Sequence, residues 1–345
     1  MREEALAEPR SFLRRALLLA VILTAVFAVA GAGIAAYWYL GPYRGFADET
    51  FVEIGRGMSS KEIAKELTAH GVVRSRWGFL LVRMLHPRAT LQAGEYRFGA
   101  DTTPWQVFEK IRRGEIFYED FTVPEGSNMF DIASLLAGLD SVRPKDFLEA
   151  AADPELIRDI DARAPDLEGY LFPSTYRVTH QTTGRQLCRT MTAEFRKQWA
   201  ALGGASDART AHEIVTLASL VEKETAIPGE RPVVAAVFAN RLRLGMPLQC
   251  DPTTVYAALL ENRFRGTIHR SDLASANPYN TYTHAGLPPG PIANPGAASL
   301  SAALHPVATN YLYFVAKPDG SGTHHFSATL AEHEKAVLDY RGQAR

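Results

Sequence analysis

Apolar residues form one unbroken run near the start of the chain. No charged residue occurs between Arg15 and Arg44, and the segment from Ala16 to Leu40 consists of apolar residues, Gly, Thr and a closing Tyr37-Trp38-Tyr39. A helix needs about 20 apolar residues to cross a bilayer, and Tyr and Trp favour its interface with water. The pattern therefore predicts a transmembrane helix over residues 16–40.

Flanking charge predicts the orientation of this helix. Arg10, Arg14 and Arg15 precede it, whereas only Arg44 follows closely. Because positive charge stays on the cytoplasmic side, we expect a cytoplasmic tail over residues 1–15 and export of everything after about residue 41. A cleaved signal peptide is the alternative, since Ala30-Gly31-Ala32 resembles a cleavage site, but the apolar run is too long for a typical one.

Shorter patterns of apolar and polar residues follow over residues 41–118. They predict strands over 51–54 and 94–98, and helices from Ser59 or Ser60 to Ala69, over 75–85 and over 105–113. This order resembles the LysM class of glycan-binding modules. A basic stretch without any acid lies between Leu67 and Gly94, and it could be only a solvated face; its arginines are Arg74, Arg76, Arg83 and Arg88.

A helical spacing recurs at the centre of the second half of the chain. Ile214, Leu217 and Val221 lie at i, i+3 and i+7, which predicts a helix over 211–225 with one apolar face. At about 100° per residue, Glu224 lies roughly 60° from the centre of that face and Glu222 roughly 100° away. A carboxyl kept partly dry has a raised proton affinity, which suits a general acid. The alternative is a solvated, charged helix face.

The rest of residues 119–345 mixes helices with long loops. We expect helices over 186–202, 232–244 and 330–340, a buried strand over 311–315, and an unusually long loop over 277–296. Aromatic rings, amides and carboxylates gather in these loops, and such groups stack on and hydrogen-bond to sugars. Packing and loop scaffolding are the alternative roles. The candidate substrate-binding residues are Glu168, Tyr170, Asn240, Gln249, Asp251, Thr253, Tyr279, Asn280 and Tyr282.

Composition excludes several other functions. A formal net charge of −1 gives no reason to expect a nucleic-acid partner. Cys188 and Cys250 have no metal-type spacing, and we expect two buried thiols rather than a disulfide. The only histidine cluster, His324-His325 with His333, lacks an HExxH pattern, and no GxSxG or phosphate-binding glycine motif occurs. We expect neither a metal nor a cofactor.

Several blocks in order resemble the endolytic murein transglycosylases, the MltG or YceG-like family. They cover about residues 45 to 340, and they are Leu167 to Tyr176, Ala218 to Thr225, Phe238 to Leu242, Leu248 to Tyr256, Tyr279 to Tyr282, Gly286 to Ile292 and Tyr311 to Ala316. The resemblance implies an α+β protein with a single N-terminal transmembrane helix (16–40), a small LysM-like module (41–118) and a mixed α/β catalytic domain (119–345) around the helix of Glu224.

The same resemblance implies an activity. Such enzymes sit in the bacterial inner membrane, face the periplasm, and cut nascent peptidoglycan between N-acetylmuramic acid and N-acetylglucosamine, leaving 1,6-anhydromuramyl ends. Such cleavage would terminate the elongation of glycan strands, and the resemblance implies the peptidoglycan synthesis machinery as a partner. The second Glu of the family's Glu-Lys-Glu motif is catalytic, which here is Glu224. Cys250 departs from the family, whose members tend to carry Thr or Ser there. A non-catalytic glycan-binding protein and a hydrolytic muramidase are the alternatives.

Overall fold

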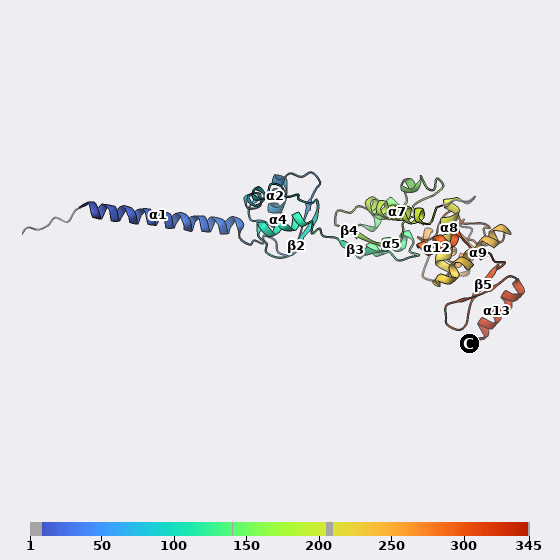
Figure 1. Ribbon diagram of the computed structural model, residues 1–345. Coiled ribbons are helices and arrows are strands. Elements are labelled where there is room, and N and C mark those ends of the chain that lie inside the picture. Colours follow the sequence, from blue (N-terminus) through green and yellow to red (C-terminus); the bar gives the residue numbers. More distant parts are fainter. Residues whose placement is uncertain (1–8, 140, 205–209, 344–345) are drawn as a thin grey trace, which may run out of the picture. The chain divides into compact units, whose positions relative to one another are not determined.

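The computed structural model describes residues 9–139, 141–204 and 210–343 of the chain. The chain divides into two compact units, which we call the N-terminal unit (to Tyr118) and the C-terminal unit (from Glu119). Figure 1 shows their elements in order. Residues 1–8 of the expected cytoplasmic tail lie outside the described residues.

The N-terminal unit begins with the long apolar helix α1. Residues Arg14–Leu40 of this helix are long and apolar enough to cross a membrane, and none of them is buried. After it in the chain come two strands that form an antiparallel sheet, in which Val52 lies opposite Tyr96. Helices cover the apolar face of this sheet. The elements are α1 (Pro9–Leu40), β1 (Thr50–Ile54), α2 (Ser60–Ala69), α3 (Arg76–Leu85), β2 (Gly94–Phe98) and α4 (Pro104–Arg113).

Local signals in the sequence fix these boundaries. Ser59 caps α2 in a capping box with Glu62, and Thr103 caps α4 in the same way. Gly114 ends α4 in a left-handed conformation (φ 68°) that favours glycine. The predicted strands and helices of residues 41–118 are therefore confirmed to within a residue or two at each end. The likeness of this unit to LysM modules stays a prediction.

The C-terminal unit is mostly helical around one core, with two further antiparallel strand pairs: β3 with β4, which are distant in sequence, and β5 with β6, which form a hairpin. Its first elements are β3 (Glu119–Thr122), α5 (Met129–Leu136), α6 (Pro144–Ala151), a 3-10 turn (Pro154–Ile157), β4 (Thr175–Val178), α7 (Gly184–Ala201) and α8 (Ala211–Glu224). The remainder are a 3-10 turn (Pro228–Glu230), α9 (Arg231–Arg243), α10 (Asp251–Leu260), α11 (Arg270–Leu273), α12 (Ala297–Leu304), β5 (Tyr313–Ala316), β6 (His324–Ser327) and α13 (Leu330–Gln343).

Helix α8 lies at the centre of this core and packs against α9, α10 and α12. Every residue from Ile214 to Val221 is buried, so the helix is enclosed on all sides rather than on one face. The prediction of a buried strand over 311–315 is wrong in its burial: β5 is only half-buried, because it belongs to a two-stranded hairpin with α13 on it. Both cysteines are buried free thiols, as predicted.

Candidate active site

The carboxyl of Glu224 stands at the C-terminal end of α8, at the edge of the core. Thr210 begins this helix with a capping box to Glu213, and Thr225 ends it by turning to an extended conformation (φ −143°). The enclosed helix therefore delivers its last side chain to a fixed place next to buried groups. Lys223 by contrast is exposed, and its Nζ donates to the carbonyl oxygen of Gly126 (3.1 Å).

Burial raises the pKa of the Glu224 carboxyl, and the nearby negative charge of Asp251 adds to this. Three groups oppose the rise: a hydrogen bond from the Cys250 thiol, and the positive charges of His324 and Arg241. The side chain is thus protonated more readily than an exposed glutamate, while neighbours remain that stabilise its carboxylate. A single group with both properties can donate and then recover a proton.

The Cys250 thiol reaches Glu224 from the start of α10. Cys250 is only 1% exposed, and its backbone N–H donates to Oγ1 of Thr281 (3.0 Å). Thr253 donates to the Cys250 carbonyl oxygen (2.6 Å) and its hydroxyl also meets that of Thr281 (2.9 Å). Burial raises the pKa of this thiol well above its ordinary value, so it stays protonated and can donate to Glu224.

Three of the predicted substrate-binding residues lie near Cys250: Gln249 and Asp251 flank it in the chain, and Tyr282 approaches from a later loop. The Tyr282 hydroxyl donates to Oδ1 of Asp251 (2.5 Å), whose side chain is exposed. Gln249 is exposed as well and has a left-handed backbone (φ 52°), which is uncommon for a residue other than glycine. Asp251 and Tyr282 therefore lie near Glu224, and Gln249 is exposed next to Cys250 in the chain; contact of the three with a ligand stays a prediction.

Two cationic groups near Glu224 were not among the candidates chosen from the sequence. Arg241 of α9 donates from Nε to the carbonyl oxygen of Leu312 (2.7 Å), and its guanidinium lies 5.2 Å from the centre of the Tyr313 ring. The Nδ1 of His324 lies 2.7 Å from Oε2 of Glu230. Arg241 belongs to a block that carried the family resemblance, whereas the strand position of His324 gave no signal of this contact.

The Glu222 side chain is only 5% exposed, and it has a different environment. Its carboxylate accepts from Arg231 (3.1 Å) and from the backbone N–H of Gly296 (2.9 Å), so both oxygens are occupied. The alternative of a solvated Glu-Lys-Glu face is therefore wrong for the two glutamate side chains, which meet other parts of the protein, although Lys223 between them is exposed. Glu222 ties α8 to α9 and to the start of α12.

Glu168 and Tyr170 lie inside the protein. Glu168 is 1% exposed; its carboxyl accepts from the backbone N–H of Met129 (2.9 Å), the Tyr256 hydroxyl (3.1 Å) and Nδ2 of Asn294 (2.8 Å). Burial raises the pKa of Glu168 to about 8. Tyr170 is fully buried and donates to Asp161. These enclosed contacts weigh against direct contact with sugar, and a substrate-binding role for either residue stays a prediction.

The remaining candidates hold loops in place. Asn280 is fully buried and its Nδ2 lies within hydrogen-bonding distance of the carbonyl oxygens of three residues, with the shortest distance to Ser275 (2.8 Å). Thr253 is equally buried, and Asn240 donates to the carbonyl oxygens of Thr309 and Tyr311. The Tyr279 ring is half-buried, 5.1 Å from that of Tyr256. Their contact with substrate likewise stays a prediction.

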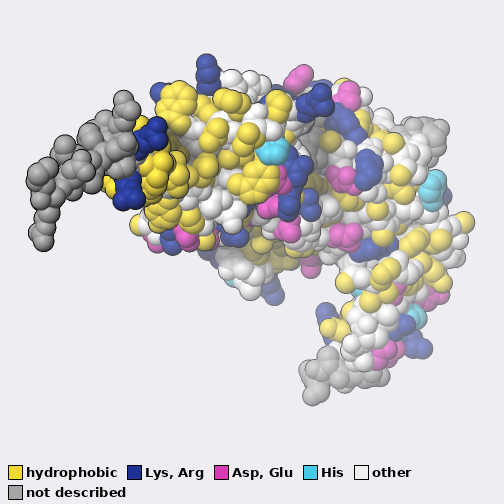
Figure 2. Space-filling view, turned by 60° about the vertical axis from the view of Figure 1, so that its left-hand side comes forward, with side chains coloured by type: hydrophobic (Ala, Val, Ile, Leu, Met, Phe, Trp, Pro, Cys, Tyr) yellow, Lys and Arg dark blue, Asp and Glu magenta, His cyan; other side chains and the backbone are white. Residues whose placement is uncertain are grey.

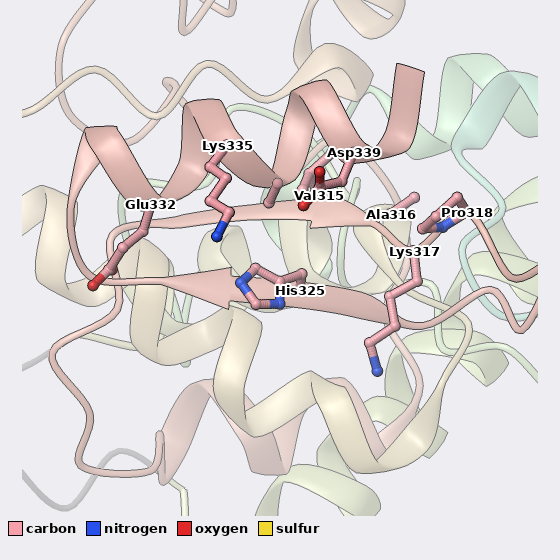
Figure 3. Close-up of a pocket in the computed structure, with 9 residues that line it drawn as sticks. Val315, Ala316, Lys317, Pro318, His325, Glu332, Lys335 and Asp339 are labelled. Atoms are coloured by element: carbon pink, nitrogen blue, oxygen red, sulfur yellow. The ribbon is translucent and has the colours of Figure 1, made fainter. Parts of the chain in front are cut away.

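A separate cavity of about 490 Å³ opens between the β5–β6 hairpin and α13. Figure 3 shows Lys335 reaching from α13 toward His325 of β6, with Glu332 and Lys317 at its sides. Successive residues of a strand point to opposite faces, so His325 lies on the face away from His324. The cavity is thus distinct from the Glu224 site.

The Glu224 site has the features of an acid–base enzyme centre: a partly desolvated carboxyl with a raised pKa, next to exposed polar side chains. Among the described residues, no group of three or more His, Cys, Asp or Glu side chains could hold a metal ion. The YceG-like family matches residues 52–339 of the chain, and the chain belongs to this family.

Curated relatives and a solved structure agree with this assignment. The endolytic murein transglycosylase of Bacillus subtilis (strain 168) is 33% identical over 84% of this chain and 84% of its own length. That of Streptococcus pneumoniae serotype 2 is 28% identical over 84% of this chain and 58% of its own length. A crystal structure of a yceG-like protein from Listeria monocytogenes is 30% identical, with a TM-score of 0.52 over 84% of this chain and 99% of that one.

Proposed function

We propose that the chain is a lytic transglycosylase that cleaves peptidoglycan glycan strands, with Glu224 as its catalytic acid and base. The observation that carries the proposal is the environment of this carboxyl, where burial raises the pKa while Cys250, His324 and Arg241 oppose the rise. The name shared by the relatives from Bacillus subtilis and Streptococcus pneumoniae supplies the substrate and the type of cleavage.

In the proposed reaction, protonated Glu224 gives its proton to the glycosidic oxygen as the bond from that oxygen to C1 of N-acetylmuramic acid breaks. The C6 hydroxyl oxygen then bonds to C1, and its proton returns to the Glu224 carboxylate. No water enters, so one carboxyl suffices. Gln249, Asp251 and Tyr282 stand at the exposed edge and supply polar contacts to the sugars.

We further propose that α1 anchors the enzyme in the inner membrane, with residues after about 41 in the periplasm. The length and composition of Arg14–Leu40 support the anchor, and the arginines before it support the orientation. Cleavage of nascent strands from this position would terminate their elongation and place the enzyme beside the peptidoglycan synthesis machinery.

Hydrolysis is the second candidate function, because a hydrolase needs a second carboxylate and Asp251 is close enough to raise the pKa of Glu224. Mass spectrometry of products from peptidoglycan strands distinguishes the two. The full chain should release ends lighter by one water than reducing ends, and Glu224→Gln should abolish them.

Glu213→Gln is the matched control, since Glu213 lies on the same helix but at its start, where it caps the helix and approaches Arg163 (4.0 Å). It should keep the wild-type products. Reducing ends from the wild type would establish hydrolysis, and intact strands from a folded wild type would establish a binding protein.

A further inference from the structure

Helix α3 of the N-terminal unit carries an apolar stripe that is largely exposed. Gly78, Phe79 and Val82 face the core, and the helix packs against α2 and α4. Its outward face is nevertheless apolar as well, at the i, i+4, i+7 and i+8 positions of one stripe. The exposed fractions are 59% for Trp77, 43% for Leu81, 72% for Met84 and 69% for Leu85.

This stripe lies beside the end of α1. A mostly apolar groove of about 740 Å³ runs between the two helices, lined by Ala35, Ala36 and Tyr39 on one side and by Trp77, Leu81 and Met84 on the other. The helices approach closely: a Cβ added to Gly78 would lie 2.1 Å from the Tyr39 carbonyl oxygen. Figure 2 shows hydrophobic side chains gathered over this part of the chain.

The length of α1 places the groove at the membrane surface. The 27 residues of Arg14–Leu40 span about 40 Å, whereas the hydrocarbon core is about 30 Å thick. Arg14 and Arg15 hold the near end at one interface, so the excess projects at the Leu40 end. The turns that carry Tyr37, Trp38 and Tyr39 therefore lie at headgroup depth, and α3 lies with them.

The charge around the stripe fits an anionic surface. No acidic residue occurs between Glu66 and Glu95, and Arg74, Arg76, Arg83 and Arg88 all fall in that interval. Arg74 stacks 4.4 Å from the Trp38 ring, which ties it to the end of α1. None of the four has a carboxylate partner within 4 Å among the described residues. Apolar and aromatic side chains ringed by arginines are the pattern of helices that lie in a bilayer interface.

We propose that the outward face of α3, formed by Trp77, Leu81, Met84 and Leu85, docks on the surface of a bilayer that contains anionic phospholipid. The proposal rests on the membrane anchor proposed above and is independent of catalysis. Docking fixes the N-terminal unit against the membrane instead of leaving it free beneath α1. An apolar face continuous with a spanning helix favours lipid over a second protein as its occupant.

The test uses the full chain at one copy per lipid nanodisc, with an environment-sensitive fluorophore on Met84→Cys. Nanodiscs of phosphatidylcholine with phosphatidylglycerol also carry a headgroup spin-labelled lipid as quencher. Glu53→Cys is the matched control, because Glu53 is exposed on β1 between Val52 and Ile54, which face the core. The unsubstituted chain, whose two thiols are buried, is the labelling blank.

We expect quenching at position 84 to be several-fold stronger than at position 53. Quenching at position 84 should weaken in nanodiscs without phosphatidylglycerol, and also in a variant that carries both Arg76→Gln and Arg88→Gln. Equal quenching at the two positions in correctly loaded discs would overturn the docking but not the anchor. A chain that fails to enter discs would overturn both, and shielding of position 84 only at several copies per disc would identify a second copy as the occupant.

Discussion

Replacement of Cys250 by alanine tests how the proton affinity of Glu224 is set. The change removes the thiol that donates to the Glu224 carboxyl and leaves the burial of that carboxyl in place. A single hydrogen bond of this kind contributes about 1 kcal/mol, which corresponds to about 0.7 of a pKa unit. Because the thiol lowers the pKa, its loss should raise it.

The assay is the pH dependence of kcat/KM for anhydro-product release, which reports the free enzyme. A general acid must be protonated, so the rate falls as pH rises through the pKa of Glu224. In Cys250→Ala the alkaline limb should therefore move upward by about 0.7 of a pH unit. Cys250→Ser keeps a donor and should leave the limb at the wild-type position or below it.

Cys188→Ala is the matched control, because Cys188 is an equally buried free thiol but lies on α7. It should destabilise the protein without moving the limb. If all three variants share the wild-type limb, or if Cys250→Ala moves it downward, then the thiol does not set the proton affinity of Glu224 and the reasoning is refuted.

Three further changes test the scaffold. Glu168→Ala leaves three buried donors without an acceptor, so the free energy of unfolding measured in urea should fall by about 3 kcal/mol. If Glu168 instead contacted the substrate, the same change would raise KM. Burial alone would raise the pKa of Asp161, but hydrogen bonds from His212 and Tyr170 hold it below its usual value. This stabilisation is lost as pH falls through the lowered pKa, so Asp161→Asn should destabilise by about 2 kcal/mol near neutral pH and by less in acid. Gly78→Ala brings a Cβ against a backbone oxygen and should lower the thermal midpoint by several degrees, whereas an unchanged midpoint would show that the helices do not approach closely.

Local patterns predicted most of the elements, because their signals lie within a few residues of one another. The capping serine before α2 gave a helix start that the structure reproduces, whereas the capping threonines of α4 and α8, Thr103 and Thr210, were recognised only in the structure. The spacing of Ile214, Leu217 and Val221 also gave the correct helix. It could not show that α8 is enclosed on every side, since that depends on α9, α10 and α12, which are distant in sequence.

The candidate site was harder to predict for the same reason. Gln249, Asp251 and Tyr282 were expected near a sugar on composition, and the structure brings Asp251 and Tyr282 near Glu224. Glu168 has the same residue type as Glu224, yet three internal donors surround it. No property of the sequence around Glu168 distinguishes a carboxyl that organises loops from one that faces a ligand.

The two glutamates at the end of α8 show how one enclosed helix can serve both structure and chemistry. Glu222 meets Arg231 and a backbone N–H, so its charge is neutralised where it lies and it holds neighbouring elements together. Among the described residues, no salt bridge reaches Glu224; the hydrogen bond from the Cys250 thiol and the charges of His324 and Arg241 lower its pKa. A buried carboxyl with a full salt bridge would be a poor acid, because its pKa would be depressed. Two residues further along the same helix, the lack of such a partner leaves Glu224 able to hold a proton and to release it.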